Sequence, residues 1–150
     1  MAHWIFQGNP DKFDIERYLA ATKEALWLVR RYRDDIQEGD TVFLWKNKGT
    51  SGQWAGIIAL ATVDGPVADQ PDKEDARPFW MKKGEASTIK PRVPLLIGKV
   101  VDGKNAIRRD QVLNDPELQD LPNIKQPQGT NYPLESRHAE RLAALWSKIG

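Results

Sequence analysis

The segment 127–133 brings together residue types that can hold and read a planar, uncharged ligand. Its residues are Pro127, Gln128, Gly129, Thr130, Asn131, Tyr132 and Pro133. The two prolines fix φ and each removes a backbone donor, while the glycine allows backbone conformations that other residues avoid. The amides, hydroxyl and phenol between them can hydrogen-bond without carrying charge at neutral pH. The pattern indicates a rigid loop facing a planar partner or, alternatively, a common turn that begins the next helix with Tyr132 over a core edge.

Tryptophan is the second unusual feature of the chain, with six residues: Trp4, Trp27, Trp45, Trp54, Trp80 and Trp146. Indoles are rarely fully buried, so we expect several to lie partly exposed or to line a cavity. A base taken out of its stack is held by aromatic faces and by hydrogen bonds to its edge. Faces can come from Trp27, Trp45 and Tyr132, and edge contacts from Asn9, Gln128, Thr130 and Asn131. Each of these residues taken alone is more often structural.

Sequence signatures of catalysis and of phosphate-binding loops are missing. The chain contains no GxGxxG, Walker or GxSxG pattern. It has no cysteine, which excludes disulfides and thiolate chemistry, and only two histidines, which gives a zinc site little to work with. An enzyme would need a titratable group in its cleft, and the candidates are Asp34, Asp40 and His138. We expect no catalytic activity, cofactor or metal.

Composition is that of one globular domain spanning residues 1–150. Hydrophobic residues make up 40% and charged residues 29% of the chain, and the net charge is +1. Basic residues nevertheless cluster, at Arg30 and Arg31 and at Lys46 and Lys48. There is neither an apolar run of membrane-spanning length nor a secretory signal, so we expect a cytoplasmic protein without a membrane partner.

Hydrophobic patterning predicts short strands mixed with helices. Strands are expected at 4–7, 41–45, 54–63 and 92–101, and helices from Asp11 or Asp14 to about residue 22, at 107–113 and at 134–149. Residues 33–36 read as a helical turn. The elements lack the alternation of strand and helix that is typical of a parallel sheet. A compact α+β domain around a curved or barrel-like sheet follows.

The sequence also predicts the character of three connecting segments and of two residues, Gly56 and Pro94. We expect a polar hairpin loop at 46–53, a mobile acidic loop at 65–78 and irregular structure at 115–127. Gly56, inside an apolar strand, predicts a bulge or the close approach of another backbone or of a ligand. Pro94 predicts a sheet edge or a bulge, because proline has no N–H to donate to a neighbouring strand.

Several ordered motifs together resemble a known family. They are Trp4-Ile5-Phe6-Gln7-Gly8-Asn9-Pro10, Trp27-Leu28-Val29 followed by Tyr32-Arg33-Asp34, Gly39-Asp40-Thr41-Val42-Phe43-Leu44-Trp45, Ala55-Gly56-Ile57, and the segment 127–133. In this order and at this spacing the chain resembles, over nearly its whole length, the EVE domain of the PUA-like superfamily, a relative of YTH domains. The chain departs mildly, with Gly8 where alanine is common and Tyr132 where phenylalanine is common.

The resemblance implies a PUA-like fold, with a curved mixed β-sheet or β-barrel flanked by helices and a concave pocket. It implies a non-catalytic module that recognises a modified base in nucleic acid, with DNA favoured over RNA. Any effector protein would have to be supplied in trans. The implied base-binding residues are Asn9, Trp27, Trp45, Gln128, Gly129, Thr130, Asn131 and Tyr132. The phosphate-binding residues would be Arg30, Arg31, Lys46 and Lys48, because cationic side chains hold the backbone while base contacts specify. The alternatives are an enzyme or accessory factor acting on a nucleotide or RNA base, and a module that binds a small ligand.

Overall fold

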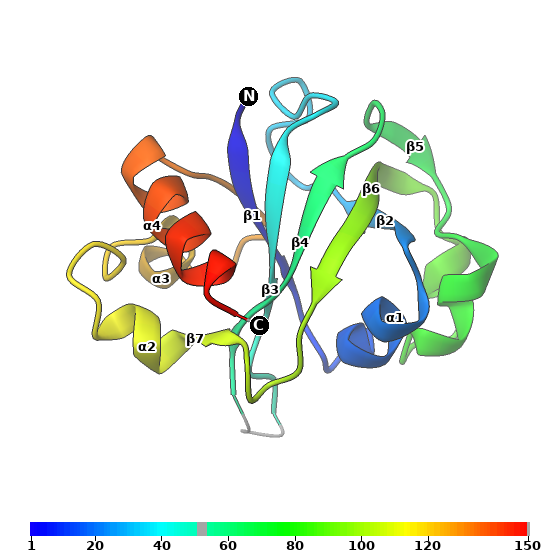
Figure 1. Ribbon diagram of the computed structural model, residues 1–150. Helices are drawn as coiled ribbons and strands as arrows, with labels where there is room; N and C mark the ends of the chain where they lie inside the picture. The colour runs from blue at the N-terminus through cyan, green and yellow to red at the C-terminus, as the bar shows by residue number, and fades with distance from the viewer. Residues whose placement is uncertain (51–53, 150) are drawn as a thin grey trace.

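One curved mixed sheet forms the centre of the molecule (Figure 1). The computed structural model describes residues 1–50 and 54–149. Its strands are β1 (His3–Gly8), β2 (Glu24–Leu28), β3 (Thr41–Lys46), β4 (Gly56–Val63), β5 (Ala68–Gln70), β6 (Lys90–Val100), β7 (Ile107–Arg108) and β8 (Asn131–Pro133). The strand order is β2-β6-β4-β3-β1-β8, with β5 paired to β6 and β7 paired to β4. β1 and β3 are parallel, and the other described pairs are antiparallel.

Helices flank this sheet on two sides (Figure 1). They are α1 (Ile15–Ala21), α2 (Arg109–Leu113), α3 (Pro122–Lys125) and α4 (Ser136–Ser147), with 3-10 helices η1 (Glu74–Phe79) and η2 (Glu85–Ser87). Figure 1 shows α2, α3 and α4 on one side, and α1 on the other with the segment that carries η1 and η2. The expected fold class, a curved mixed sheet flanked by helices, is confirmed.

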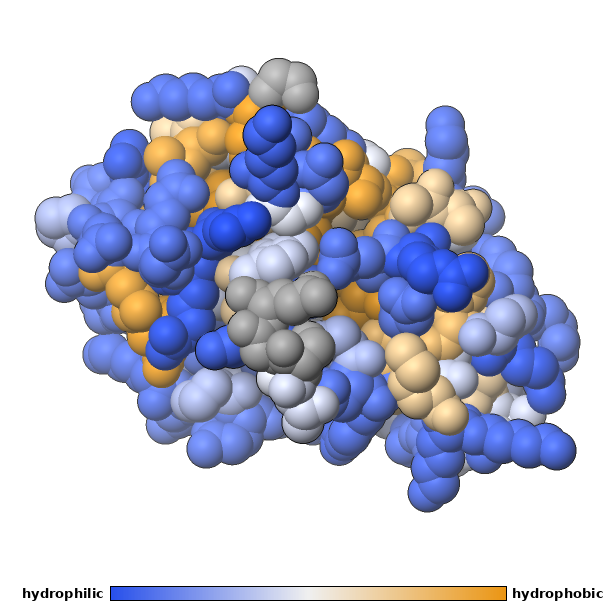
Figure 2. All heavy atoms as spheres, turned by 90° about the horizontal axis from the view of Figure 1, so that it is seen from below, coloured by the Kyte–Doolittle hydropathy of each residue, from blue (hydrophilic) through white to orange (hydrophobic). Residues whose placement is uncertain are grey.

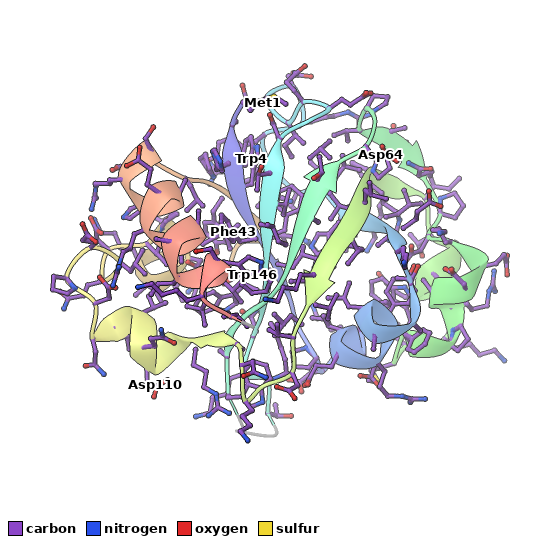
Figure 3. All side chains as sticks on the ribbon, viewed as in Figure 1. Met1, Trp4, Phe43, Asp64, Asp110 and Trp146 are labelled. Atoms are coloured by element: carbon purple, nitrogen blue, oxygen red, sulfur yellow. The ribbon has the colours of Figure 1, made fainter. Side chains whose placement is uncertain are left out.

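Two hydrophobic cores lie on the two faces of the sheet. Along β1 the side chains alternate, so Trp4 and Phe6 belong to one core and Ile5 to the other. The second core contains Phe43 of β3 and Trp146 of α4, which Figure 3 labels in the region between α4 and the sheet. Because β1 and β3 are covered on both faces, they are almost continuously apolar rather than alternating.

Several segments are more ordered than their composition predicts. The expected mobile loop at 65–78 instead contains β5, paired with β6, and most of η1. The expected irregular stretch at 115–127 contains α3. The last helix begins at Ser136 rather than at residue 134, because residues 131–133 pair with β1 as β8. Part of the expected hairpin loop, residues 51–53, lies outside the described residues.

Gly56 lies against another backbone, as expected. A Cβ atom at this position would lie 2.3 Å from the carbonyl oxygen of Ile107 and 2.8 Å from Cα of Arg108. The absent side chain is what lets β7 pair closely with β4.

Pro94 does not lie on an edge strand, because β6 has neighbours on both sides. Its carbonyl accepts a hydrogen bond from the amide of Asp64, the first residue beyond β4. The N–H and C=O groups of one strand residue point to the same side of the strand. The side of Pro94 that lacks an N–H donor therefore faces the segment beyond the end of β4. A proline is therefore tolerated inside the sheet.

Hydrophilic residues cover most of the face seen from below, with smaller hydrophobic areas between them (Figure 2). Among the described residues, no helix combines the length and apolar character that a membrane span requires.

Candidate functional site

A cavity of about 360 Å³ opens beside the end of β1. Strand β1 and the residues after it, α1, β2, the region of Trp80 and the segment 127–130 all contribute to its lining. The lining residues used below are Gln7, Asn9, Trp27, Arg30, Asp72, Trp80, Arg92, Pro127, Gln128, Gly129 and Thr130. Both the volume and the mixture of aromatic walls with a few polar groups are typical of small-ligand sites.

Two indoles form apolar parts of the cavity wall. Trp27, on β2, is 8% exposed and donates from Nε1 to the carbonyl of Gln7 at 3.2 Å. Trp80 follows η1 and is half-buried, with the ring of Phe13 set edge-on at a centroid distance of 4.8 Å. Hydrogen bonds and packing thus fix the orientation of both rings before any ligand enters.

The segment 127–130 is held in place by the side chain of Gln7. Its Nε2 donates to the carbonyl of Pro127 at 3.0 Å and to that of Gly129 at 2.8 Å. Its Oε1 in turn accepts from Nδ2 of Asn123, on α3, at 3.1 Å. The backbone amide of Gln7 also donates to the carbonyl of Thr130 at 2.7 Å. The segment is therefore a fixed loop, and its rigidity comes from β1 as much as from its own prolines.

Tyr132 supports this loop from the other side of the sheet. Its side chain belongs to the second core, and its hydroxyl accepts from the amide of Gly129 and donates to the carbonyl of Gln126. A Cβ atom at position 129 would lie 2.8 Å from that hydroxyl, so glycine is what allows the contact. Burial raises the pKa of Tyr132, which keeps the phenol protonated. Tyr132 does not line the cavity.

Asn131 also holds the loop rather than facing the cavity. It is buried, donates from Nδ2 to the carbonyl of Leu28 at 3.1 Å and accepts at Oδ1 from the amide of Arg30 at 2.8 Å. These two bonds satisfy one backbone group at the end of β2 and one just past it. Asn131 therefore fixes the loop to the strand that carries Trp27.

A pair of buried charged groups forms the remaining polar wall. The side chains of Asp72 and Arg92 are 3% and 1% exposed, with Nη1 3.8 Å from Oδ2. Asp72 accepts at Oδ2 from Nε1 of Trp80 at 2.8 Å and at Oδ1 from the amide of Lys73 at 2.8 Å. Burial raises the pKa of Asp72, while these donors and Arg92 act in the opposite direction.

Six of the residues predicted from the sequence line the cavity together: Asn9, Trp27, Arg30, Gln128, Gly129 and Thr130. The expectation that Trp45 forms a second wall does not hold, because its side chain packs in the second core, across the sheet from the Trp27 cluster. Lys46 is buried, donates from Nζ to the carbonyl of Trp54 at 2.8 Å and has its pKa lowered by burial, so it does not reach a phosphate. Arg31 and Lys48 are exposed outside the lining, and their role stays a prediction.

The titratable residues considered for catalysis lie elsewhere. Asp34 is exposed, and Asp40 is buried beneath Trp4, accepting from its Nε1 at 2.9 Å and from the amide of Gln37 at 2.9 Å. His138 is buried on α4 with Nε2 2.8 Å from Oδ1 of Asp120. Within 1–50 and 54–149, no cluster of three His, Asp or Glu side chains could hold a metal ion.

Sequence reasoning missed Asp72, Trp80 and Arg92 as cavity residues. Asp72 stood in a segment whose acidic, proline-rich composition resembles a solvated loop. Arg92 offered a signal, since an arginine within a strand of apolar residues must be paired or face a cavity. For Trp80 the only signal in the sequence was that the residue is a tryptophan.

Comparison with known proteins gives a consistent assignment. Residues 2–145 match the family model of the EVE domain. Similar solved structures include a hypothetical protein from Leishmania major (19% identity, TM-score 0.67, covering 99% of this chain and 96% of that one) and a Pseudomonas syringae protein (21%, 0.64, 96% and 99%). Another is the human THYN1 protein, solved in complex with DNA containing 5-methylcytosine (16%, 0.66, 100% of both chains).

Comparison with curated protein sequences found no match. The likeness to the solved structures shows the fold, a PUA-like half-barrel with flanking helices. Because the family model matches nearly all of its length, the chain belongs to the EVE domain family.

Proposed function

We propose that this domain is a non-catalytic module that binds nucleic acid carrying a modified base, DNA in preference to RNA. The base is taken from a flipped or single-stranded position and held in the cavity between Trp27 and Trp80. The observation that carries the proposal is the composition of this cavity, in which two fixed indoles stand with the neutral side chains of Asn9, Gln128 and Thr130. Flipped bases are recognised by this combination of stacking and edge contacts.

The residues around the cavity are suited to binding. The acid or base candidates named from the sequence, Asp34, Asp40 and His138, do not line it. The carboxylate that does line it, Asp72, lies beside Arg92 and is held by hydrogen bonds from Trp80 and Lys73. Arg30 is exposed and lines the cavity, where its charge suits a phosphate next to the bound base. The DNA complex of the structurally similar THYN1 protein favours DNA as the nucleic acid.

Rigidity of the cavity matters for telling a modified base from an unmodified one. Burying one methyl group contributes about 0.8 kcal/mol, or roughly fourfold in affinity. A larger preference requires a cavity whose shape is fixed before binding. The hydrogen bonds that Gln7, Asn131 and Tyr132 make to the loop and to β2 supply that fixed shape.

The direct test is titration of single-stranded oligonucleotides that differ in one central base: cytosine, 5-methylcytosine or 5-hydroxymethylcytosine. Fluorescence anisotropy at two salt concentrations, with matching RNA strands, measures affinity and its salt dependence. We expect tighter binding of a modified DNA strand at both salt concentrations. Equal and strongly salt-dependent binding of all strands would leave only attraction to phosphates and contradict the proposal.

A pair of glutamine variants separates the cavity from the rest of the surface. Gln128 is exposed and lines the cavity, whereas Gln111 is exposed on α2. We expect Gln128→Ala to weaken binding of the modified strand and Gln111→Ala to leave it unchanged. Exposed alanine substitutions of this kind leave stability nearly unaltered, so the comparison reports on binding.

A further inference from the structure

The cavity contains two charged side chains whose hydrogen-bonding capacity is only partly used. Arg92 donates from Nε to the carbonyl of Gln70 at 3.0 Å and from Nη2 to that of Thr88 at 3.2 Å. Its Nη1 has no hydrogen-bond partner within the described residues, since Asp72 is 3.8 Å away. A guanidinium group has five N–H donors in a fixed plane, so the donors on Nη1 are left over.

Asp72, the carboxylate beside Arg92, has unused acceptor positions in the same cavity. Its carboxylate is oriented by two donors, Nε1 of Trp80 and the amide of Lys73, each at 2.8 Å. A carboxylate offers about four acceptor positions, so each oxygen keeps capacity for a further donor. Both side chains are at least 97% buried and both line the cavity. Buried charges are costly unless they are fully hydrogen-bonded, and a ligand edge between them would complete the set.

We propose that Asp72 and Arg92 read the hydrogen-bonding edge of the bound base, and that they select a base with an exocyclic amine next to a ring acceptor. The amine donates to Asp72, and the adjacent ring nitrogen or carbonyl accepts from Nη1 of Arg92. Cytosine-type bases and adenine share this edge. Thymine and hypoxanthine in the same orientation place a carbonyl against the carboxylate and an N–H against the guanidinium. The inference rests on the proposed function and adds the edge that the cavity reads.

Thymine and 5-methylcytosine make a matched pair of probes, because both carry the 5-methyl group and differ only in this edge. Adenine and hypoxanthine form the corresponding purine pair. Each base is placed at the centre of the same single-stranded DNA. We expect the amino-bearing member of one pair to bind roughly 5- to 150-fold tighter, which is the range for a good two-point base contact. The pair that shows the preference identifies the base as pyrimidine or purine. Equal affinity within both pairs would overturn the inference.

The variant Asp72→Asn tests the role of the carboxylate, and Asp75→Asn is its control. Asp75 is a nearby exposed carboxylate that binds the hydroxyl of Tyr18 and does not line the cavity. In the pair that shows the preference, we expect Asp72→Asn to reduce it to less than about threefold, because the amide of asparagine can accept from an amine or donate to a carbonyl. Asp75→Asn should keep the wild-type ratio. An unchanged ratio in Asp72→Asn would overturn the assignment of Asp72.

A probe on the wild-type protein keeps the test valid if Asp72→Asn does not fold. The same strand with 5-methyl-2-pyrimidinone lacks the exocyclic amine and keeps the ring and methyl group. If the pyrimidine pair is the one that shows the preference, affinity equal to that for 5-methylcytosine would overturn the inference. A preference for 5-methylcytosine over cytosine, without discrimination against thymine or the pyrimidinone, would overturn this inference and leave the proposed function standing. Absence of binding to every strand would contradict both.

Discussion

The hydroxyl of Tyr132 accepts a hydrogen bond from the backbone amide of Gly129 at 2.7 Å. The same hydroxyl donates to the carbonyl of Gln126 at 2.5 Å, so one phenol ties both ends of the loop 126–129 to the second core. The loop is therefore held in its conformation by a residue that does not line the cavity.

Tyr132→Phe should therefore loosen the loop without altering the cavity lining. Because it leaves two partly buried backbone groups without a partner, we expect a loss of about 1–3 kcal/mol in the free energy of unfolding, measured with urea. The control is Tyr32→Phe, because Tyr32 is a half-buried residue whose hydroxyl has no hydrogen-bond partner in the described part of the chain. A Tyr132→Phe protein as stable as the control would show that these bonds contribute nothing.

Trp80→Ala should weaken binding of a modified-base strand by roughly 5- to 150-fold, which corresponds to ~1–3 kcal/mol for one stacked base. Trp80→Phe keeps an aromatic face and removes the N–H bound to Asp72, so we expect an intermediate affinity. The control Trp54→Phe changes a half-buried indole outside the lining, between Lys46 and Arg108. Anisotropy titrations would argue against stacking on Trp80 if Trp80→Ala and Trp54→Phe bound alike.

Gly56→Ala should destabilise the domain by about 1–3 kcal/mol, the usual cost of inserting a methyl group where the surroundings cannot yield. The obstacle is backbone, because the new Cβ would lie 2.3 Å from the carbonyl oxygen of Ile107. Gly65→Ala serves as the control, since its nearest contact is the side chain of Pro94 at 3.0 Å. Thermal unfolding should give a clearly lower midpoint for Gly56→Ala than for Gly65→Ala, and equal midpoints would contradict the packing argument.

Asp120→Asn should reduce the fall in the free energy of unfolding as the pH is lowered. Hydrogen bonds from Arg137 and His138 hold the pKa of Asp120 well below its usual range. A carboxylate with a depressed folded-state pKa stabilises the fold above its unfolded pKa of about 3.9, and this contribution is lost as the pH falls through the folded value. We expect Asp120→Asn to be less stable than wild type at pH 6 and the difference to shrink toward pH 2. Asp110→Asn, at an exposed carboxylate without an ion pair among the described residues, serves as the control.

The sequence predicted the cavity loop and one aromatic wall better than it predicted the charged wall. Pro127, Gly129 and Trp27 stood out because their residue types are restrictive and their motif neighbours are close in the chain. Asp72 and Arg92 are brought together only by the pairing of β5 with β6, and such long-range pairing leaves no local pattern. Trp45 was misplaced for a simpler reason. A tryptophan in a strand that is buried on both faces gives no sign of which face it occupies.

The pairing of β1 with β8 has a consequence for biosynthesis. Strand β1 is translated before its outer neighbour at residues 131–133, which follows more than 120 residues later. Contacts of such long sequence separation are slow to form, and the exposed edge of β1 offers a site for misassembly in the meantime. Because Gln7 on that strand shapes the loop 127–130, the cavity can be completed only after residues 127–130 have been translated. The buried residues of the first core, from Trp4 to Ala106, are therefore all translated before the cavity loop, whereas the second core also needs Trp146 of α4.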